Sequence, residues 1–109
     1  MNLRISIVFA LVTLSNIPAR AGVRDIHRSK LPQSASVLQA YDDLAHFEPY
    51  ARDWAAEWKF DVPKDKVRRA LSSDLSTLTA AQSTAPDNLE LMLLTGLAAH
   101  YAYTDPAHS

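Results

Sequence analysis

Apolar residues recur three and four positions apart through most of this chain, which is the spacing of one face of an α-helix. The first such segment covers residues 35–47, with Ser34 or Ser36 available to cap its start. Its apolar face consists of Val37, Leu38, Tyr41, Leu44 and Ala45. Because proline lacks an N–H and restricts the residue before it, we expect Pro49 to end this helix.

A second helix is predicted over residues 49–59, because proline suits the first turn of a new helix. Tyr50, Trp54 and Trp58 are spaced four residues apart and would form one aromatic stripe along it. Such a stripe can stack against a sugar or a base, or it can pack between helices. We favour packing in a half-exposed seam, because Tyr and Trp carry polar tips on apolar rings.

A third helix is predicted over residues 63–84, with Leu71, Leu75 and Leu78 as the centre of its apolar stripe. A basic cluster lies near its start and consists of Lys64, Lys66, Arg68 and Arg69. This cluster could bind an anion or an acidic partner. We favour a solvated face whose charges pair with nearby carboxylates, namely Asp61, Asp65 and Asp74.

A fourth helix is predicted over residues 88–103, capped by Asp87 or Asn88. At 100° per residue its apolar side chains fall on every side, so we expect the helix to be buried all round. It is shorter than the roughly 20 residues that span a membrane. Gly96 in its middle is unfavourable for helix formation and is typical of a place where another helix approaches closely.

The first 21 residues have the order of a secretory signal peptide. Basic Arg4 precedes the apolar run ISIVFALVTL, and Pro18 precedes the small residues Ala19 and Ala21. Cleavage is expected after Ala21, which leaves Gly22 first and places the protein in the periplasm or outside the cell. The alternative, a membrane anchor, would need an apolar run about twice as long. We therefore expect no stable membrane anchor after cleavage. Residues 22–33, which follow the cleavage site, are expected to form a flexible leader.

Composition narrows the class of protein further. The chain has 109 residues, 48% of them hydrophobic, which indicates one globular domain, placed over residues 34–109. A net charge of -1 does not favour a nucleic acid partner, and only two glycines disfavour a sandwich or barrel. There is no cysteine, so disulfides and thiolate metal sites are excluded. The fold class expected is therefore all-α, built from antiparallel helical hairpins.

Residues 85–101, APDNLELMLLTGLAAHY, resemble the junction between two tetratricopeptide (TPR-like) repeats. The nearest matches to the repeat pattern are Pro86, Leu93 or Leu94, Gly96 and Tyr101. The resemblance covers residues 63–103, although Thr95 stands where the repeats usually have leucine. It implies an incomplete or capped repeat stack, because a second helix after Tyr103 is missing. Proteins of this family are scaffolds that hold a peptide or a partner helix in a groove between helices.

No catalytic, cofactor or metal site is predicted. The imidazoles are His27, His46, His100 and His108, and no two of them have the i, i+4 spacing that a helical zinc site would use. The adjacent carboxylates of Asp42 and Asp43 point about 100° apart on a helix and do not converge. Phosphate-binding and nucleophile motifs are also missing from the sequence.

The sequence therefore predicts an exported helical scaffold or protein-interaction module without catalytic activity of its own. Its partner would be a protein, a peptide or a second copy of the chain. The candidate surface consists of Tyr50, Trp54, Trp58, Leu93, Leu97, His100 and Tyr101. Two alternatives stay open: the N-terminal portion of a larger exported enzyme, and a small helical homo-oligomer.

Overall fold

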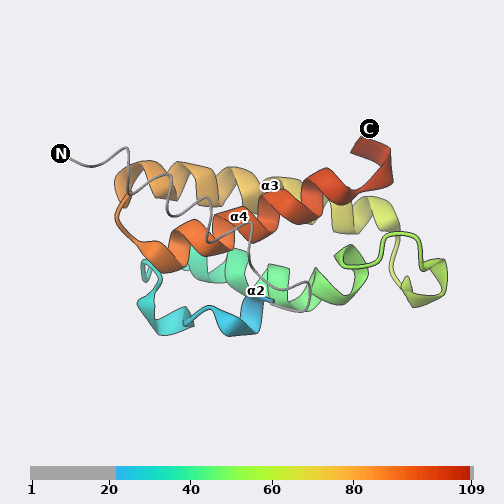
Figure 1. Ribbon diagram of the computed structural model, residues 1–109, viewed down its shortest axis with the longest axis horizontal. Helices are drawn as coiled ribbons and strands as arrows, with labels where there is room; N and C mark the ends of the chain where they lie inside the picture. The colour runs from blue at the N-terminus through green and yellow to red at the C-terminus, as the bar shows by residue number, and fades with distance from the viewer. Residues whose placement is uncertain (1–21, 109) are drawn as a thin grey trace.

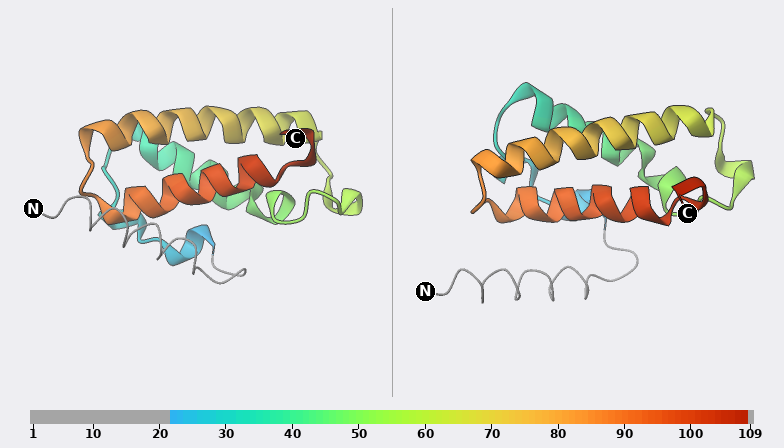
Figure 2. Two further views of the ribbon diagram at one scale, coloured as in Figure 1. Left: turned by 45° about the horizontal axis from the view of Figure 1, so that its top comes forward. Right: turned by 90° about the horizontal axis from the view of Figure 1, so that it is seen from above.

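Three long α-helices lie side by side and alternate in direction along the chain (Figures 1 and 2). They are α2 (Ala35–Ala51), α3 (Lys64–Thr84) and α4 (Leu89–Thr104). The short 3-10 helices are η1 (Val23–Asp25), η2 (Arg28–Lys30), η3 (Glu57–Lys59) and η4 (Pro106–His108). This computed structural model describes residues 22–108, and within them there is no strand. The predicted all-α class with antiparallel hairpins is confirmed.

The core lies where α3 packs against both α2 and α4. Each long helix contributes apolar residues at helical spacing, as the hydrophobic pattern predicts. The largest fully buried side chains are Val23, Val37, Leu44, Val67, Leu71, Leu78, Leu91 and Leu94. Burial of these side chains is the main favourable contribution to folding, at about 1.5–3 kcal/mol for a fully buried Val or Leu side chain.

The ends of the helices match the predicted capping chemistry at two places. The Ser34 hydroxyl accepts from the Val37 N–H at 3.4 Å at the start of α2. The Asn88 side chain accepts from the Leu91 N–H at 2.9 Å at the start of α4. Both bonds satisfy N–H groups that have no partner within the helix. The predicted ranges 63–84 and 88–103 agree with α3 and α4 to within a residue.

The predicted helix end at Pro49 is wrong, because α2 continues through Pro49 to Ala51. A proline inside a helix removes a backbone hydrogen bond and crowds the preceding turn. Here its neighbours Phe47 and Ala51 are buried, at 7% and 1% exposure, so packing of this last turn offsets the loss.

The predicted helix over residues 49–59 is not formed. After α2 the chain makes turns and then the short helix η3. Trp54 turns into the core and lies stacked with Phe60, with ring centroids 5.9 Å apart. Its indole Nε1–H donates to the carbonyl oxygen of Tyr101 at 3.1 Å. In a continued helix, Trp54 and Trp58 would lie on the same face and would be buried or exposed together. The turn instead lets Trp54 be buried while Trp58 is exposed.

The predicted flexible leader is also wrong, because residues 22–33 pack on the helices. Val23, Ile26 and Leu31 are at most 4% exposed. Backbone groups of this segment are held by the start of α4: Glu90 accepts from the His27 N–H at 2.7 Å, and Asn88 donates to the Lys30 carbonyl at 3.0 Å. These contacts involve residues about 60 positions away, which periodicity within the segment does not reveal.

Helix α4 is buried on one side only, contrary to the prediction of burial all round. Its inner residues are Leu91, Leu94, Ala98 and Tyr101. On the opposite side Leu89 is 56% exposed and Tyr103 is 66% exposed. In the described chain only α3 and α2 pack extensively along this helix, and η4 contacts its end. The apolar outer side of α4 is therefore left in contact with water.

Candidate functional site

The predicted surface residues Tyr50, Trp54 and Trp58 do not form one stripe. Tyr50 is half-buried on α2, and its hydroxyl donates to Asp61, which raises the pKa of Tyr50. Trp54 is buried in the core, where it stacks with Phe60 and donates to the Tyr101 carbonyl. Trp58 is 83% exposed, with the Lys59 ammonium 5.2 Å from its ring centroid. Trp58 is the one member of this trio whose ring is largely exposed.

The α4 residues of the predicted surface also differ in exposure. Leu93 and Leu97 are half-buried at the edges of the core, and His100 is exposed. Tyr101 lies on the inner side, 3% exposed. Burial and a hydrogen bond to Glu48 raise the pKa of Tyr101 to about 12, so this phenol is neutral at physiological pH.

The outer face of α4 is the candidate surface that these residues indicate. It consists of Leu89, Leu93, Gly96, His100 and Tyr103, which project within about 80° of one another around the helix at 100° per residue. Three of them are exposed and two are half-buried. Leu89 and Tyr103, at the two ends of α4, are its exposed large apolar side chains, and half-buried Leu93 lies between them on the same face. This face is therefore the candidate interaction surface.

A groove of about 300 Å³ lies beside the C-terminal end of α4. Its apolar wall includes Leu71, Leu75, Ala102 and Tyr103. This volume is at the lower end of the range of about 300–1,000 Å³ for small-molecule sites.

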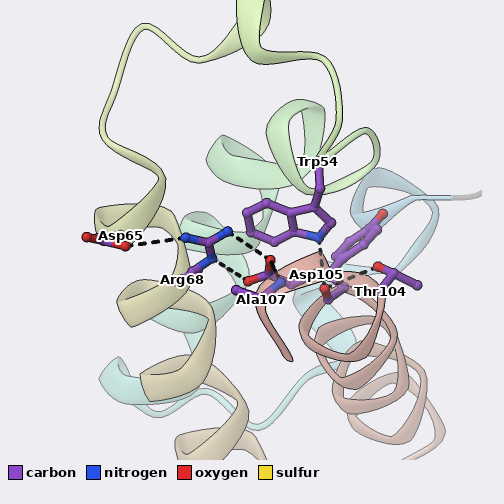
Figure 3. Close-up of polar contacts among 7 residues, drawn as sticks. Trp54, Asp65, Arg68, Thr104, Asp105 and Ala107 are labelled. Atoms are coloured by element: carbon purple, nitrogen blue, oxygen red, sulfur yellow. Dashed lines mark hydrogen bonds and ion pairs between the residues drawn. The ribbon is translucent and has the colours of Figure 1, made fainter. Parts of the chain in front are cut away.

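The charged side of this groove is an ion pair between α3 and the chain after α4 (Figure 3). Arg68 Nε lies 2.6 Å from Asp105 Oδ2, and Arg68 Nη2 lies 3.1 Å from Asp105 Oδ1. The guanidinium also lies over the Trp54 ring, 5.7 Å from its centroid. Burial alone would raise the pKa of Asp105, but hydrogen bonds from Arg68 and the Ala107 N–H outweigh it and lower the pKa. Both charges are satisfied by each other, so the geometry gives this pair a structural role in closing the α3–α4 hairpin.

The basic cluster at the start of α3 only partly follows the prediction. Arg68 pairs with Asp65 at 3.3 Å, as expected, and with Asp105. The Lys64 ammonium lies 5.0 Å from the centroid of Phe60. Asp74, predicted to pair with this cluster, is instead buried at 6% exposure.

Asp74 faces Asp43 of α2, so the structure brings together two carboxyl groups from different helices. Burial, and then the charge and hydrogen bond of Asp43, raise the pKa of Asp74 to about 7. Its Oδ2 has no hydrogen-bond partner. Gln39 donates to Asp43 at 2.9 Å and so holds that carboxylate in place. The carboxyl pair can share a proton near neutral pH, and the sequence, which offered only Asp42 beside Asp43, did not indicate it.

Glu48 is a second buried carboxylate, at 9% exposure. Its Oε2 accepts from the Val23 N–H at 2.9 Å and from the Tyr101 hydroxyl at 2.5 Å. Arg52 interacts with the same group, and its hydrogen bond with Tyr101 and the charge of Glu48 raise the pKa of Arg52. No spacing in the sequence predicts this cluster, because its members come from three segments more than 20 residues apart.

Among residues 22–108, no group of three or more His, Cys, Asp or Glu side chains is placed to hold a metal ion. No helix in this range has the length and apolar character needed to cross a membrane. The proposed cleavage residues Ala19 and Ala21 lie outside the described residues.

No protein-family model matches this chain, and neither a curated protein nor a solved structure matches it. The TPR-like relationship over residues 63–103 therefore stays a prediction.

Proposed function

We propose that this chain is an exported helical scaffold that binds a partner helix through the outer face of α4. The proposal includes no catalytic activity and no cofactor. It is carried by one observation: Leu89 and Tyr103 are 56% and 66% exposed on a helix whose apolar residues lie on every side. Water contact with such a face is unfavourable by about 25 cal/mol for each Å² of apolar surface, and a partner would remove it.

Gly96 favours a helix as the partner. It lies near the middle of the outer face and is half-exposed. A glycine in mid-helix destabilises that helix by up to about 1 kcal/mol relative to alanine, but it lets another backbone approach closely. Leu93 and His100 lie one turn before and one turn after it, so a partner helix could pack along this line. Two helices that pack along such a line interdigitate their side chains, and a small residue at the crossing lets their axes come close.

Export is the second part of the proposal. It is supported by the basic, apolar and small-residue order of residues 1–21. Small exported domains often rely on disulfides. Because this chain has no cysteine, the exported protein would rely on packing instead. The buried contacts of residues 22–33 supply part of that packing.

The interaction proposal can be tested with the chain that begins at Gly22. The wild type and a Leu89→Gln/Tyr103→Gln double variant are compared for binding of a fluorescent apolar dye and for sedimentation. Trp58→Gln serves as the control, because Trp58 is exposed but lies outside α4. We expect the wild type and the control to bind dye or to self-associate, and the double variant to do so much less with unchanged helical circular dichroism.

Self-association that the double variant abolishes would identify the partner helix as that of a second copy. Dye binding by a monomer would leave a different protein or peptide as the partner. A wild-type chain that is monomeric, folds cooperatively and binds no dye contradicts the proposal. Export is tested separately by locating the protein in cell fractions.

A further inference from the structure

Gly22 is buried against a charged cluster. Its backbone N–H donates to Asp25 Oδ2 at 2.8 Å. A Cβ built on Gly22 would lie 2.5 Å and 2.8 Å from the two Glu48 carboxylate oxygens, and 2.7 Å from Arg52 Nη2. Because a Cβ is one bond from the Cα, these atoms surround the Gly22 backbone closely. The site thus accepts glycine and excludes a larger residue unless Glu48 moves.

The cluster has unequal charges. Asp25 and Glu48 are the two carboxylates, and among the described residues the Arg52 guanidinium is the cation that interacts with the charges of both and lies beside Gly22. Tyr101 of α4 faces the same carboxylate but is neutral, since burial raises its pKa to about 12. With both carboxylates ionised, these groups sum to one negative charge. Glu48 is buried and Asp25 lies at the exposed edge of the cluster, so one additional cation at buried Gly22 that donates several hydrogen bonds would stabilise both carboxylates.

We infer that the α-ammonium of Gly22, freed by cleavage after Ala21, is that cation and anchors the mature chain in the Asp25–Glu48 cluster. The cleavage is a hydrolysis: water adds across the Ala21–Gly22 peptide bond, the carboxylate stays on Ala21, and the amine of Gly22 takes up a proton. The peptide nitrogen offers one neutral N–H donor, whereas the ammonium offers three donors and a positive charge.

The anchor would link processing to stability. Val23, next in the chain, donates its N–H to Glu48 and has a fully buried side chain. An ammonium held at Gly22 therefore fixes the first apolar residue of the core. One additional residue would displace the charge by about 3.8 Å, the distance between consecutive Cα atoms, and would replace the ammonium at Gly22 with an amide.

This inference rests on the export and cleavage parts of the proposed function, so the first measurement is the N-terminal residue of the exported protein. The second compares two purified chains, one starting at Gly22 and one at Ala21. Both contain the whole described core, which begins at Val23. Each is released from a fusion partner by a protease that leaves the intended first residue, and thermal unfolding is followed at pH 6–10.

We expect Gly22 at the start of the exported protein. The chain that starts at Gly22 should unfold several degrees above the longer chain at pH 7. An α-amino group normally has a pKa of about 7.7–8.0, and the two carboxylates should raise the pKa of Gly22 in the folded state. The added stability is then complete below about pH 7.7 and is lost as pH rises through the folded value. The melting temperatures of the two chains should therefore converge at high pH.

Asp25→Asn is the variant of choice, because Asp25 is exposed and its substitution leaves the core intact. It should reduce the difference between the two chains and lower the pKa of the Gly22 amine. That pKa can be measured by NMR titration of glycine labelled in the backbone. Glu48→Gln should have a larger effect, if the variant folds.

The outcomes separate the two ideas. Equal stability of the two chains, or an amine pKa within the usual range, overturns the anchor and leaves export untouched. An exported protein that starts at another residue overturns the anchor while export stands. A chain that is neither exported nor cleaved overturns both.

Discussion

The Tyr101 hydroxyl donates a hydrogen bond of 2.5 Å to Glu48 Oε2, the same oxygen that accepts from the Val23 N–H. This oxygen joins three parts of the chain: the segment before α2, the helix α2 and the helix α4. Since the protein has no cysteine, these parts are held by noncovalent contacts. A buried carboxylate is stabilised when its oxygens accept several hydrogen bonds, and it becomes unfavourable when one is removed.

Tyr101→Phe removes one of those bonds and leaves the ring in place. We expect the free energy of unfolding to fall by about 1–3 kcal/mol, because Glu48 stays buried with a donor missing. Urea unfolding of the chain from Gly22 measures this change. Tyr103→Phe is the matched control: this ring is 66% exposed, so the change should be within about 0.5 kcal/mol. Equal effects of the two substitutions would contradict a special role for the Tyr101 hydroxyl.

The Asp43–Asp74 pair makes a prediction about pH. The pKa of Asp74 is raised to about 7, above its value in the unfolded chain, so the folded state holds the proton more tightly. This contribution to stability is fully present below about pH 3.9 and is lost as pH rises through about 7. Asp74→Asn keeps a neutral side chain at every pH. It should flatten this part of the stability profile and raise the free energy of unfolding at pH 8 by about 1–3 kcal/mol.

The measurement is urea unfolding between pH 4 and pH 8. Asp87→Asn removes an exposed carboxylate from the loop before α4 and should leave the pH profile unchanged. If Asp74→Asn and wild type keep the same pH dependence, the two carboxyl groups do not share a proton.

The two tryptophans differ in exposure, which predicts separable fluorescence. Trp54 is 5% exposed and Trp58 is 83% exposed. A Trp58→Phe chain, which keeps Trp54, should emit at shorter wavelength and resist quenching by acrylamide. A Trp54→Phe chain should emit at longer wavelength and be quenched readily. Similar emission from the two variants would support the continuous aromatic stripe that the spacing predicted.

The elements that could be predicted from the sequence were those held by local chemistry. Asn88 caps α4 as expected, and the spacing of Leu71, Leu75 and Leu78 gave the helical segment that became α3. Both depend on residues within a turn or two of one another. The all-α class follows from such local signals, because nearly every segment carries them.

The elements that were predicted wrongly depend on distant contacts. Pro49 stays helical because the last turn of α2 is packed, and residues 22–33 are ordered by α2 and α4. Nothing within either segment reports these partners. The same holds for the candidate site: the sequence found apolar residues on all sides of α4, but which side faces water is decided by where α2 and α3 pack.

Arg68 and Asp105 form the last testable contact, because together they tie the start of α3 to the chain after α4. Arg68→Met keeps an unbranched apolar side chain at this position and removes the guanidinium, with its charge, its hydrogen bonds to Asp105 and its contact with the Trp54 ring. It should lower the free energy of unfolding by about 1–3 kcal/mol, since Asp105 would stay mostly buried without its partner. Asp105→Asn and the double variant complete a cycle whose coupling energy should be about 1 kcal/mol.

The pH dependence of this pair has the opposite sign to that of Asp74. Because the pKa of Asp105 is lowered, its contribution is present above about pH 3.9 and is lost as pH falls through the folded value. The coupling energy should therefore be measurable at pH 6 and should decrease as the pH falls below about 3.9 and Asp105 takes up a proton. A coupling energy near zero at pH 6 would mean that the ion pair stabilises the hairpin no more than exposed charges do, and that the packing of Trp54 closes it instead.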